Sequence, residues 1–269
     1  MDGLPEPVRP IAGCARLGAA LWARRSGAAP AYFRSAGSRC CQRYRSGVDK
    51  GATADLDRLY REVRERVATL ISSLDVVELD ARVPTCPAWT VNDVVAHLAA
   101  TPEDVIAGRL ADIPSDDFTA GQVARFTGVP VARRLARWAD VAPQFEQIIS
   151  AFQVWPALID VASHEQDIRS ATGRPGERES AAIRQCTRML LSFLEVPLPL
   201  RVITEDGEYR AGPPDQPELV LTTTRFEAFR WRMGRRSRAQ LAAMAWTGDP
   251  APLLDYLAVF GPATSDIIE

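Results

Sequence analysis

The amino-acid sequence predicts an α+β protein in which an up-and-down helical bundle is followed by a small α+β domain. Apolar residues recur with the 3.6-residue period of amphipathic helices over much of residues 52-196. After the segment "EVPLPLRV" the pattern changes to short apolar stretches separated by turn residues, which is typical of strands. We therefore divide the chain into a disordered extension (1-50), a helical bundle (52-196) and a small α+β domain (197-269).

The N-terminal 50 residues are predicted to lie outside the fold. They contain eight arginines and Lys50 but only three acidic residues, and their apolar positions follow no sustained period. This composition superficially resembles an organelle transit peptide, whereas the apolar run from Leu17 to Ala23 is too short for a typical secretory signal. We expect a flexible extension, or a start codon assigned too far upstream, rather than a targeting segment.

The first bundle helix is predicted from Ala54, because Leu56, Leu59, Val63 and Val67 follow the i, i+3, i+7 spacing of one helical face. A proline-containing loop should follow this helix. The next helix should begin at a threonine N-cap in "AWTVND", where an aspartate three residues later completes a capping box.

The remaining bundle elements follow from apolar periodicity and from prolines. The polar segment "SDDFTAGQ" is predicted to be a loop, and a third helix should run from Pro130 to about residue 149, with Pro143 as a possible kink. Pro156 suits the first turn of a fourth helix, which should end near Gly173 in "TGRPG". A fifth helix is predicted over residues 179–195.

The C-terminal part should alternate strands and helices. Strands are predicted in "LRVITED", "EYRAG" and "ELVLTTT", with a turn between the first two at Asp206 and Gly207. A helix should follow through "FEAFRWRMG", then a strand in "LAAMAWTGD" and a last helix in "PLLDYLAVF".

Composition narrows the class of function. The chain has 46% hydrophobic and 25% charged residues and a formal net charge of −2, so nothing favours a nucleic acid or an anionic membrane as partner. Its five cysteines form no CxxC pair, which excludes a cysteine-based zinc ribbon and favours a reducing cytoplasm. No apolar run approaches the roughly 18 residues that a membrane-spanning helix needs. We expect a cytoplasmic protein with no nucleic-acid or membrane partner.

The only two histidines of the chain lie in two different predicted helices. Asp160 precedes His164 by four residues, so their side chains project from the same helical face. Together with His97, they would provide two imidazoles and one carboxylate, a set that suits catalytic Zn²⁺ and also Fe²⁺, Ni²⁺, Co²⁺ or Mn²⁺. The alternative is a hydrogen-bonded surface pair for Asp160 and His164, and a core position for His97.

The chain contains three longer segments that occur in the order of one protein family. They read "VPTCPAWTVNDVVAHLA", "DVASHEQDIRSATGRPG" and "RWRMGRRSRAQLAAMAWTGDPAP". The first resembles the N-terminal signature of the mycothiol-dependent maleylpyruvate isomerase family. The second resembles that family's second motif, and the third resembles its C-terminal domain.

This resemblance implies a DinB-like bundle followed by a small α+β C-terminal domain. It also implies that a histidine on the second helix and an acid-xxx-His pair on the fourth helix hold a metal ion. His97, Asp160 and His164 occupy those positions here. One departure is the acid itself, which is glutamate in the founding isomerase and one methylene shorter in this chain.

The resemblance further implies mycothiol as a thiol cofactor. A free thiol has a pKa of about 8.5 and is mostly protonated at neutral pH, and coordination to a divalent cation deprotonates it. We therefore expect a metal-dependent and mycothiol-dependent enzyme, of isomerase or S-transferase type, that acts on an electrophilic small molecule. Zn²⁺ is the first candidate metal, and His97, Asp160 and His164 are the predicted catalytic residues. The alternative is a non-catalytic protein that binds a small ligand or metal on the same scaffold.

Weaker predictions concern residues around the second motif and the "RRSR" segment. Arg169 and Arg235 are predicted to bind the cofactor, because a guanidinium recognises carboxylates through its planar fork. The alternatives are an ion pair for Arg169 and a solvated face for Arg235. Asp167 is either a partner for the second ring nitrogen of a ligand histidine or a member of an ion pair. Cys86 is interpreted as structural.

Overall fold

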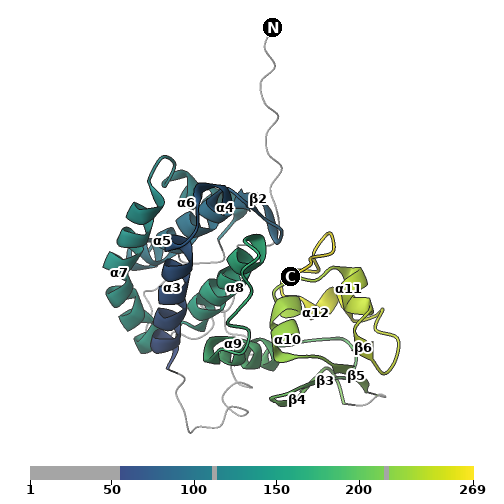
Figure 1. The fold of residues 1–269 in the computed structure, drawn as a ribbon. Coiled ribbons are helices and arrows are strands. Elements are labelled where there is room, and N and C mark those ends of the chain that lie inside the picture. The colour runs from purple at the N-terminus through teal and green to yellow at the C-terminus, as the bar shows by residue number, and fades with distance from the viewer. Residues whose placement is uncertain (1–54, 111–113, 215–217) are drawn as a thin grey trace.

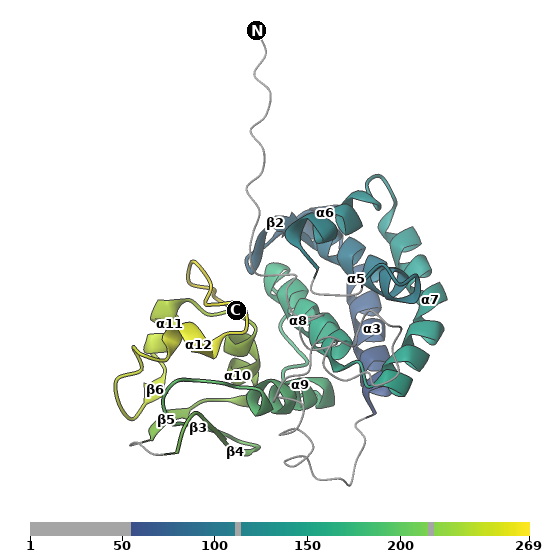
Figure 2. The same cartoon turned by 180° about the vertical axis from the view of Figure 1, so that it is seen from behind.

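The computed structural model describes residues 55–110, 114–214 and 218–269. A group of helices forms one part of the molecule, and a small sheet with its helices forms the other (Figure 1). The view from behind shows α9 and α10 where the two parts meet (Figure 2). The predicted α+β fold class, a helical bundle followed by a small α+β unit, is confirmed. The extension predicted over 1-50 lies outside the described residues.

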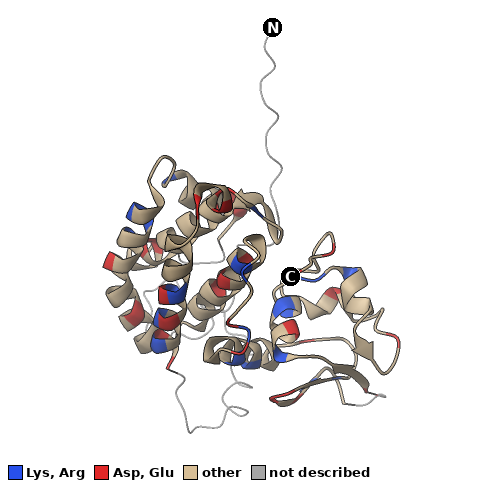
Figure 3. Ribbon diagram, in the orientation of Figure 1, with Lys and Arg blue, Asp and Glu red and all other residues tan. Residues whose placement is uncertain are grey.

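Four long helices pack against one another and share one buried apolar core. They are α3 (Leu56–Ser72), α5 (Val91–Ile106), α7 (Val131–Phe152) and α8 (Trp155–Ala171). All four were predicted, three of them from apolar periodicity and α8 from Pro156 at its start and Gly173 after its end. Pro143 lies inside α7 without ending it. Acidic and basic residues are interspersed along α3 and α7 (Figure 3). None of the described helices has the length and apolar character needed to cross a lipid bilayer.

The prediction of a loop at "SDDFTAGQ" is wrong, because this segment forms helix α6 (Asp116–Ala124). The hydroxyl of Ser115 caps the helix by accepting a hydrogen bond from the Phe118 N–H. The side chains that α6 buries are Thr119 and Gln122, both polar. A helix with a polar buried face leaves no apolar period in the sequence, and the periodicity therefore missed it.

The segment between α3 and α5 is also more regular than the predicted loop. It contains the short helix α4 (Val76–Leu79) and an antiparallel hairpin of β1 (Arg82–Val83) and β2 (Cys86–Thr90). Strand β2 leads directly into α5 and places Trp89 beside the first turns of that helix.

The C-terminal sheet has the strand order β4-β3-β5-β6. Its strands are β3 (Leu200–Thr204), β4 (Gly207–Ala211), β5 (Leu219–Thr222) and β6 (Ala245–Trp246). β3 is antiparallel to β4 and parallel to β5, and β5 is antiparallel to β6. The first three strands were predicted. The strand predicted in "LAAMAWTGD" is present as β6 but is only two residues long, because the first two residues of that segment end helix α11 (Arg238–Ala242). The final helix α12 (Leu254–Leu257) is short.

Helices α9 (Ala181–Ser192) and α10 (Arg225–Arg232) join the two parts of the molecule. Phe226 and Phe229 of α10 lie in the core of the bundle, whereas Trp231 lies in the second core beneath the sheet. The C-terminal unit is thus docked on the bundle through a helix that serves both cores. The boundary predicted between 52-196 and 197-269 stays a prediction.

Candidate metal centre

His97 reaches the interior of the bundle from α5. The helix begins at Thr90, whose hydroxyl accepts the Asp93 N–H while the Asp93 carboxylate accepts the Thr90 N–H. This reciprocal capping box, predicted from the sequence, satisfies two backbone donors at the start of the helix. His97 lies two turns further on, with 4% of its surface exposed.

Asp160 and His164 come from α8, which is buried over most of its length. The helix ends at Ala171, and Gly173 follows with a φ of 62°, a left-handed conformation that suits glycine. Because Asp160 and His164 are one turn apart, their side chains lie on the same face of α8. Both lie close to His97, so this face is turned toward α5. The prediction that these two residues meet His97 across the bundle therefore agrees with their positions.

The three side chains converge at distances typical of metal ligands. His97 Nε2 lies 3.5 Å and His164 Nε2 3.6 Å from the same oxygen, Asp160 Oδ1. Ligand atoms of a tetrahedral ion with bonds of about 2.0–2.2 Å lie about 3.3–3.6 Å apart. The observed separations are longer than hydrogen bonds and fit ligands placed around a cation. His97 Nε2 is buried and has no hydrogen-bond partner among the described residues.

The electrostatics of the site favour a positive charge between these groups. Burial by itself lowers the pKa of His97, but the carboxylate of Asp160 outweighs it, so that the net shift of this pKa is upward. Burial likewise raises the pKa of Asp160, and His97, His164 and Arg235 together outweigh it, so that this pKa is lowered. A proton or a metal cation can supply the positive charge.

Each histidine ring is also held through its second nitrogen, in two different ways. His97 Nδ1 lies 2.8 Å from Gln122 Oε1, and Gln122 Nε2 donates to Asp104 Oδ2 at 2.8 Å. Asp104 is fully buried and receives hydrogen bonds from Arg109 and Arg125. These arginines and Gln122 lower the pKa of Asp104 although burial opposes the shift.

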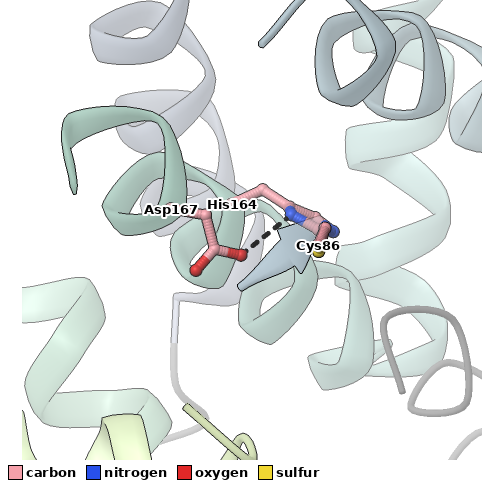
Figure 4. Close-up of side chains that lie close together, drawn as sticks. All are labelled: Cys86, His164 and Asp167. Atoms are coloured by element: carbon pink, nitrogen blue, oxygen red, sulfur yellow. Dashed lines mark ion pairs between the residues drawn. The ribbon is translucent and has the colours of Figure 1, made fainter. Parts of the chain in front are cut away.

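His164 faces a carboxylate instead of an amide. Its Nδ1 lies 3.2 Å from Asp167 Oδ2, an ion pair that Figure 4 shows as a dashed line. Asp167 also accepts from Arg230 Nη2 at 2.8 Å and from Arg235 Nη2 at 2.7 Å. Burial would raise the pKa of Asp167, but the two guanidinium groups hold it well below its usual range. Both arginines belong to the C-terminal part of the chain.

A second group, Cys86, His164 and Asp167, also lies within ligand distance (Figure 4). It is the weaker metal site for two reasons. The carboxylate of Asp167 is already held by two arginines, and Cys86 has a further partner. In the first group the other contacts of His97 and His164 are made through Nδ1, so that both Nε2 atoms face Asp160 Oδ1. The Asp160 side chain is 22% exposed, which connects the site with solvent.

The two arginines predicted to bind the cofactor face acidic side chains. Arg169 donates to Glu165 Oε1 at 3.1 Å, and Glu165 is fully buried. Arg235 is bound to Asp167 and is itself buried. Their predicted role in cofactor binding stays a prediction.

The sequence did not predict that Gln122, Asp104 and Trp89 lie next to the site. The Trp89 ring centroid lies 5.3 Å from that of His97 and 6.4 Å from that of His164, so the indole covers both imidazoles. A serine followed by two aspartates at the start of α6 is a helix-start signal that could have placed Gln122 on a helix. No local signal pairs Gln122 with His97.

Comparison with known proteins places the chain in a family. The model described as the mycothiol maleylpyruvate isomerase N-terminal domain matches residues 60–229. Two solved structures, mycothiol-dependent maleylpyruvate isomerase and a histidine-to-alanine mutant of it, are each 12% identical with a TM-score of 0.48. Each similarity covers 72% of this chain and 92% of the other. No curated protein sequence matches this chain. Because the family match spans more than half of the sequence, the protein belongs to the family of the mycothiol maleylpyruvate isomerase N-terminal domain.

Proposed function

We propose that His97, Asp160 and His164 bind a divalent metal ion and that this centre activates the thiol of mycothiol in an isomerase or S-transferase reaction. The observation that carries the proposal is the convergence of both Nε2 atoms on Asp160 Oδ1 at 3.5 and 3.6 Å. Membership of the family supports mycothiol as the thiol.

The donor set favours Zn²⁺ among the divalent metals. Two imidazole nitrogens and one carboxylate oxygen are typical of catalytic zinc sites, in which three protein ligands leave positions open for another molecule. Asp160 is the most exposed of the three residues, with 22% of its side chain accessible compared with 5% for His97 and 1% for His164. An incoming thiol would therefore approach from the side of Asp160.

Each residue of the site has a distinct part in this scheme. When bound, the metal would supply the positive charge that converts a thiol with a pKa of about 8.5 into its nucleophilic thiolate. The two histidines present Nε2 to the centre, because their Nδ1 atoms face Gln122 and Asp167. Asp160 offsets part of the cationic charge, and the Trp89 indole shields the two rings from water.

Two reaction types fit a thiolate in this position. In a cis–trans isomerisation the sulfur adds to an activated double bond, the carbon–carbon bond rotates, and the carbon–sulfur bond breaks again, which regenerates the thiol. In an S-transfer the sulfur displaces a leaving group that departs with the bonding electrons, and the thiol proton is released. The family to which the chain belongs, described as mycothiol maleylpyruvate isomerase, supports the first type.

The test is Zn²⁺ binding by the purified protein, comparing Asp160→Ala with Asp140→Ala. Asp140 lies on an exposed position of α7, so the control makes the same substitution away from the site. We expect one Zn²⁺ per chain in the wild type and in the control, and at least tenfold weaker binding in Asp160→Ala. The zinc-loaded protein should then isomerise maleylpyruvate only when mycothiol is present, or it should catalyse the transfer of the aryl group of chlorodinitrobenzene to mycothiol.

The outcomes separate the enzyme from the alternative. A wild type that binds no Zn²⁺, or that binds it equally well after Asp160→Ala, would refute the metal centre. Zinc binding without any mycothiol-dependent turnover would favour a non-catalytic protein that binds metal or a small ligand.

A further inference from the structure

We infer that Gln122 is a positioning residue that sets the tautomer of His97, so that the Nε2 lone pair faces the metal centre. The inference rests on the proposed function, because it concerns how one proposed ligand is presented. It is carried by an uninterrupted series of contacts from two arginines at the surface to the imidazole ring.

The direction of these hydrogen bonds follows from the chemistry of Asp104. Arg109 Nε donates to Oδ1 at 2.7 Å, and Arg125 Nη2 lies 2.9 and 2.8 Å from the two carboxylate oxygens. With two guanidinium partners, Asp104 is a carboxylate, which can only accept hydrogen bonds. The group that contacts it from Gln122 must therefore be the amide NH₂.

The orientation of Gln122 then determines the proton on His97. With its NH₂ turned toward Asp104, the amide presents its carbonyl oxygen to His97 Nδ1 at 2.8 Å. An oxygen accepts and does not donate, so the ring must carry its proton on Nδ1. Nε2 is then left with its lone pair, directed at Asp160 and without a hydrogen-bond partner among the described residues.

Burial makes this arrangement specific. Gln122 is 1% exposed and Asp104 is fully buried, so water does not replace a missing partner there. A ring with its proton on Nε2 would leave Gln122 Oε1 unpaired and would direct an N–H at the metal position. Partners of this kind, on the second nitrogen of a ligand histidine, typically change metal affinity about 10–100-fold when mutated.

The first measurement is the tautomer of His97 in the metal-free wild type. Long-range ¹⁵N–¹H correlation spectra distinguish the two neutral forms of imidazole, and only two histidines contribute signals. The His97→Ala variant assigns them. Recorded at a pH at which the ring is neutral, the spectrum should show the Nδ1–H form for His97. The Nε2–H form, which free histidine prefers in water, would overturn the inference.

The second measurement compares Gln122→Met with Gln166→Met. Both glutamines are buried, and the side chain of Gln166 on α8 donates to the Gly176 carbonyl, whereas that of Gln122 accepts from His97 and donates to Asp104. Methionine keeps the length of the side chain and removes the amide. We expect Gln122→Met to lose the Nδ1–H preference and to bind Zn²⁺ 10–100-fold more weakly, whereas Gln166→Met should change neither property.

Failure of this inference and failure of the proposed function give different results. If the wild type binds no Zn²⁺, the proposed function is wrong, while the tautomer in the metal-free protein still tests the role of Gln122. If Zn²⁺ binds with the same affinity in Gln122→Met, and His97 keeps the Nδ1–H form there, Gln122 has no positioning role. Should Gln122→Met not fold, the wild-type spectrum decides alone.

Discussion

The two histidines of the candidate centre are supported from opposite parts of the molecule. His97 is held by a neutral amide, Gln122, and behind it lies Asp104 with arginines that are 51% and 37% exposed. His164 is held by the carboxylate of Asp167, which pairs with two arginines that are almost fully buried. The first support belongs to the bundle alone, and the second depends on the docked C-terminal unit.

Because of this difference, removing an ion pair should cost more stability on the His164 side than on the His97 side. An ion pair near solvent loses little when one partner is removed, because water and salt screen the remaining charge. A buried pair loses much more, because the remaining charge stays in a medium of low polarity. Removing the buried ion pairs of Asp167 with the C-terminal unit should therefore cost more stability than removing the partly exposed ion pairs of Asp104.

The largest expected effect comes from removing the buried carboxylate. Asp167→Ala leaves Arg230 and Arg235 without their shared partner, although Arg230 keeps its ion pair with Glu269. We expect the free energy of unfolding to fall by about 3 kcal/mol. Urea denaturation of the metal-free protein measures this loss.

The matched substitution on the other side is Asp104→Ala. It also removes a fully buried carboxylate, but the arginines that it releases are partly exposed and lose little. The main cost is the buried Gln122 amide left without its acceptor, so the loss should be about 1 kcal/mol. Equal losses for the two variants would contradict the comparison.

The next effect is the stabilisation by metal, which requires both sides of the centre. Zn²⁺ at about 100 times its dissociation constant should raise the free energy of unfolding of the wild type by about 2.7 kcal/mol. His164→Ala removes one of the three ligand groups, so the gain should largely disappear while the helical circular dichroism persists. Thermal melts with Zn²⁺ and with EDTA measure the difference. A full gain in His164→Ala would exclude His164 as a ligand.

The smallest effect concerns the pH dependence on the His97 side. Burial raises the pKa of Asp104, but Arg125, Gln122 and Arg109 outweigh it, so this pKa is lower in the folded state than in the unfolded chain. Its contribution to stability is therefore present above the ordinary carboxyl pKa of about 4 and is lost as the pH falls through the folded-state value.

The measurement is urea denaturation of the wild type and Asp104→Asn between pH 6 and pH 3. The stability difference, on the order of 1 kcal/mol, should be constant in the upper part of this range and should shrink at its acidic end. A difference that grows toward pH 3 would mean that Asp104 is not stabilised as a carboxylate.

Several features of this protein were determined by the sequence on its own. Helices α3, α5 and α7 follow from apolar periodicity, α8 follows from Pro156 and Gly173 at its two ends, and the start of α5 follows from the Thr90 capping box. The pairing of Asp160 with His164 on one face follows from their spacing of four residues in α8. These features are local, because helical periodicity and capping depend on residues within a few positions of one another.

Only the tertiary structure decided which groups support the two histidines. Gln122 meets His97 across 25 residues of sequence, and Asp167 meets Arg230 and Arg235 across 63 and 68 residues. Apolar periodicity detects helices that bury apolar side chains, whereas α6 buries polar ones. The pattern therefore predicted neither helix α6 nor the position of Gln122. The partner of a buried polar group is set by the packing of distant elements, and a local pattern carries no record of that packing.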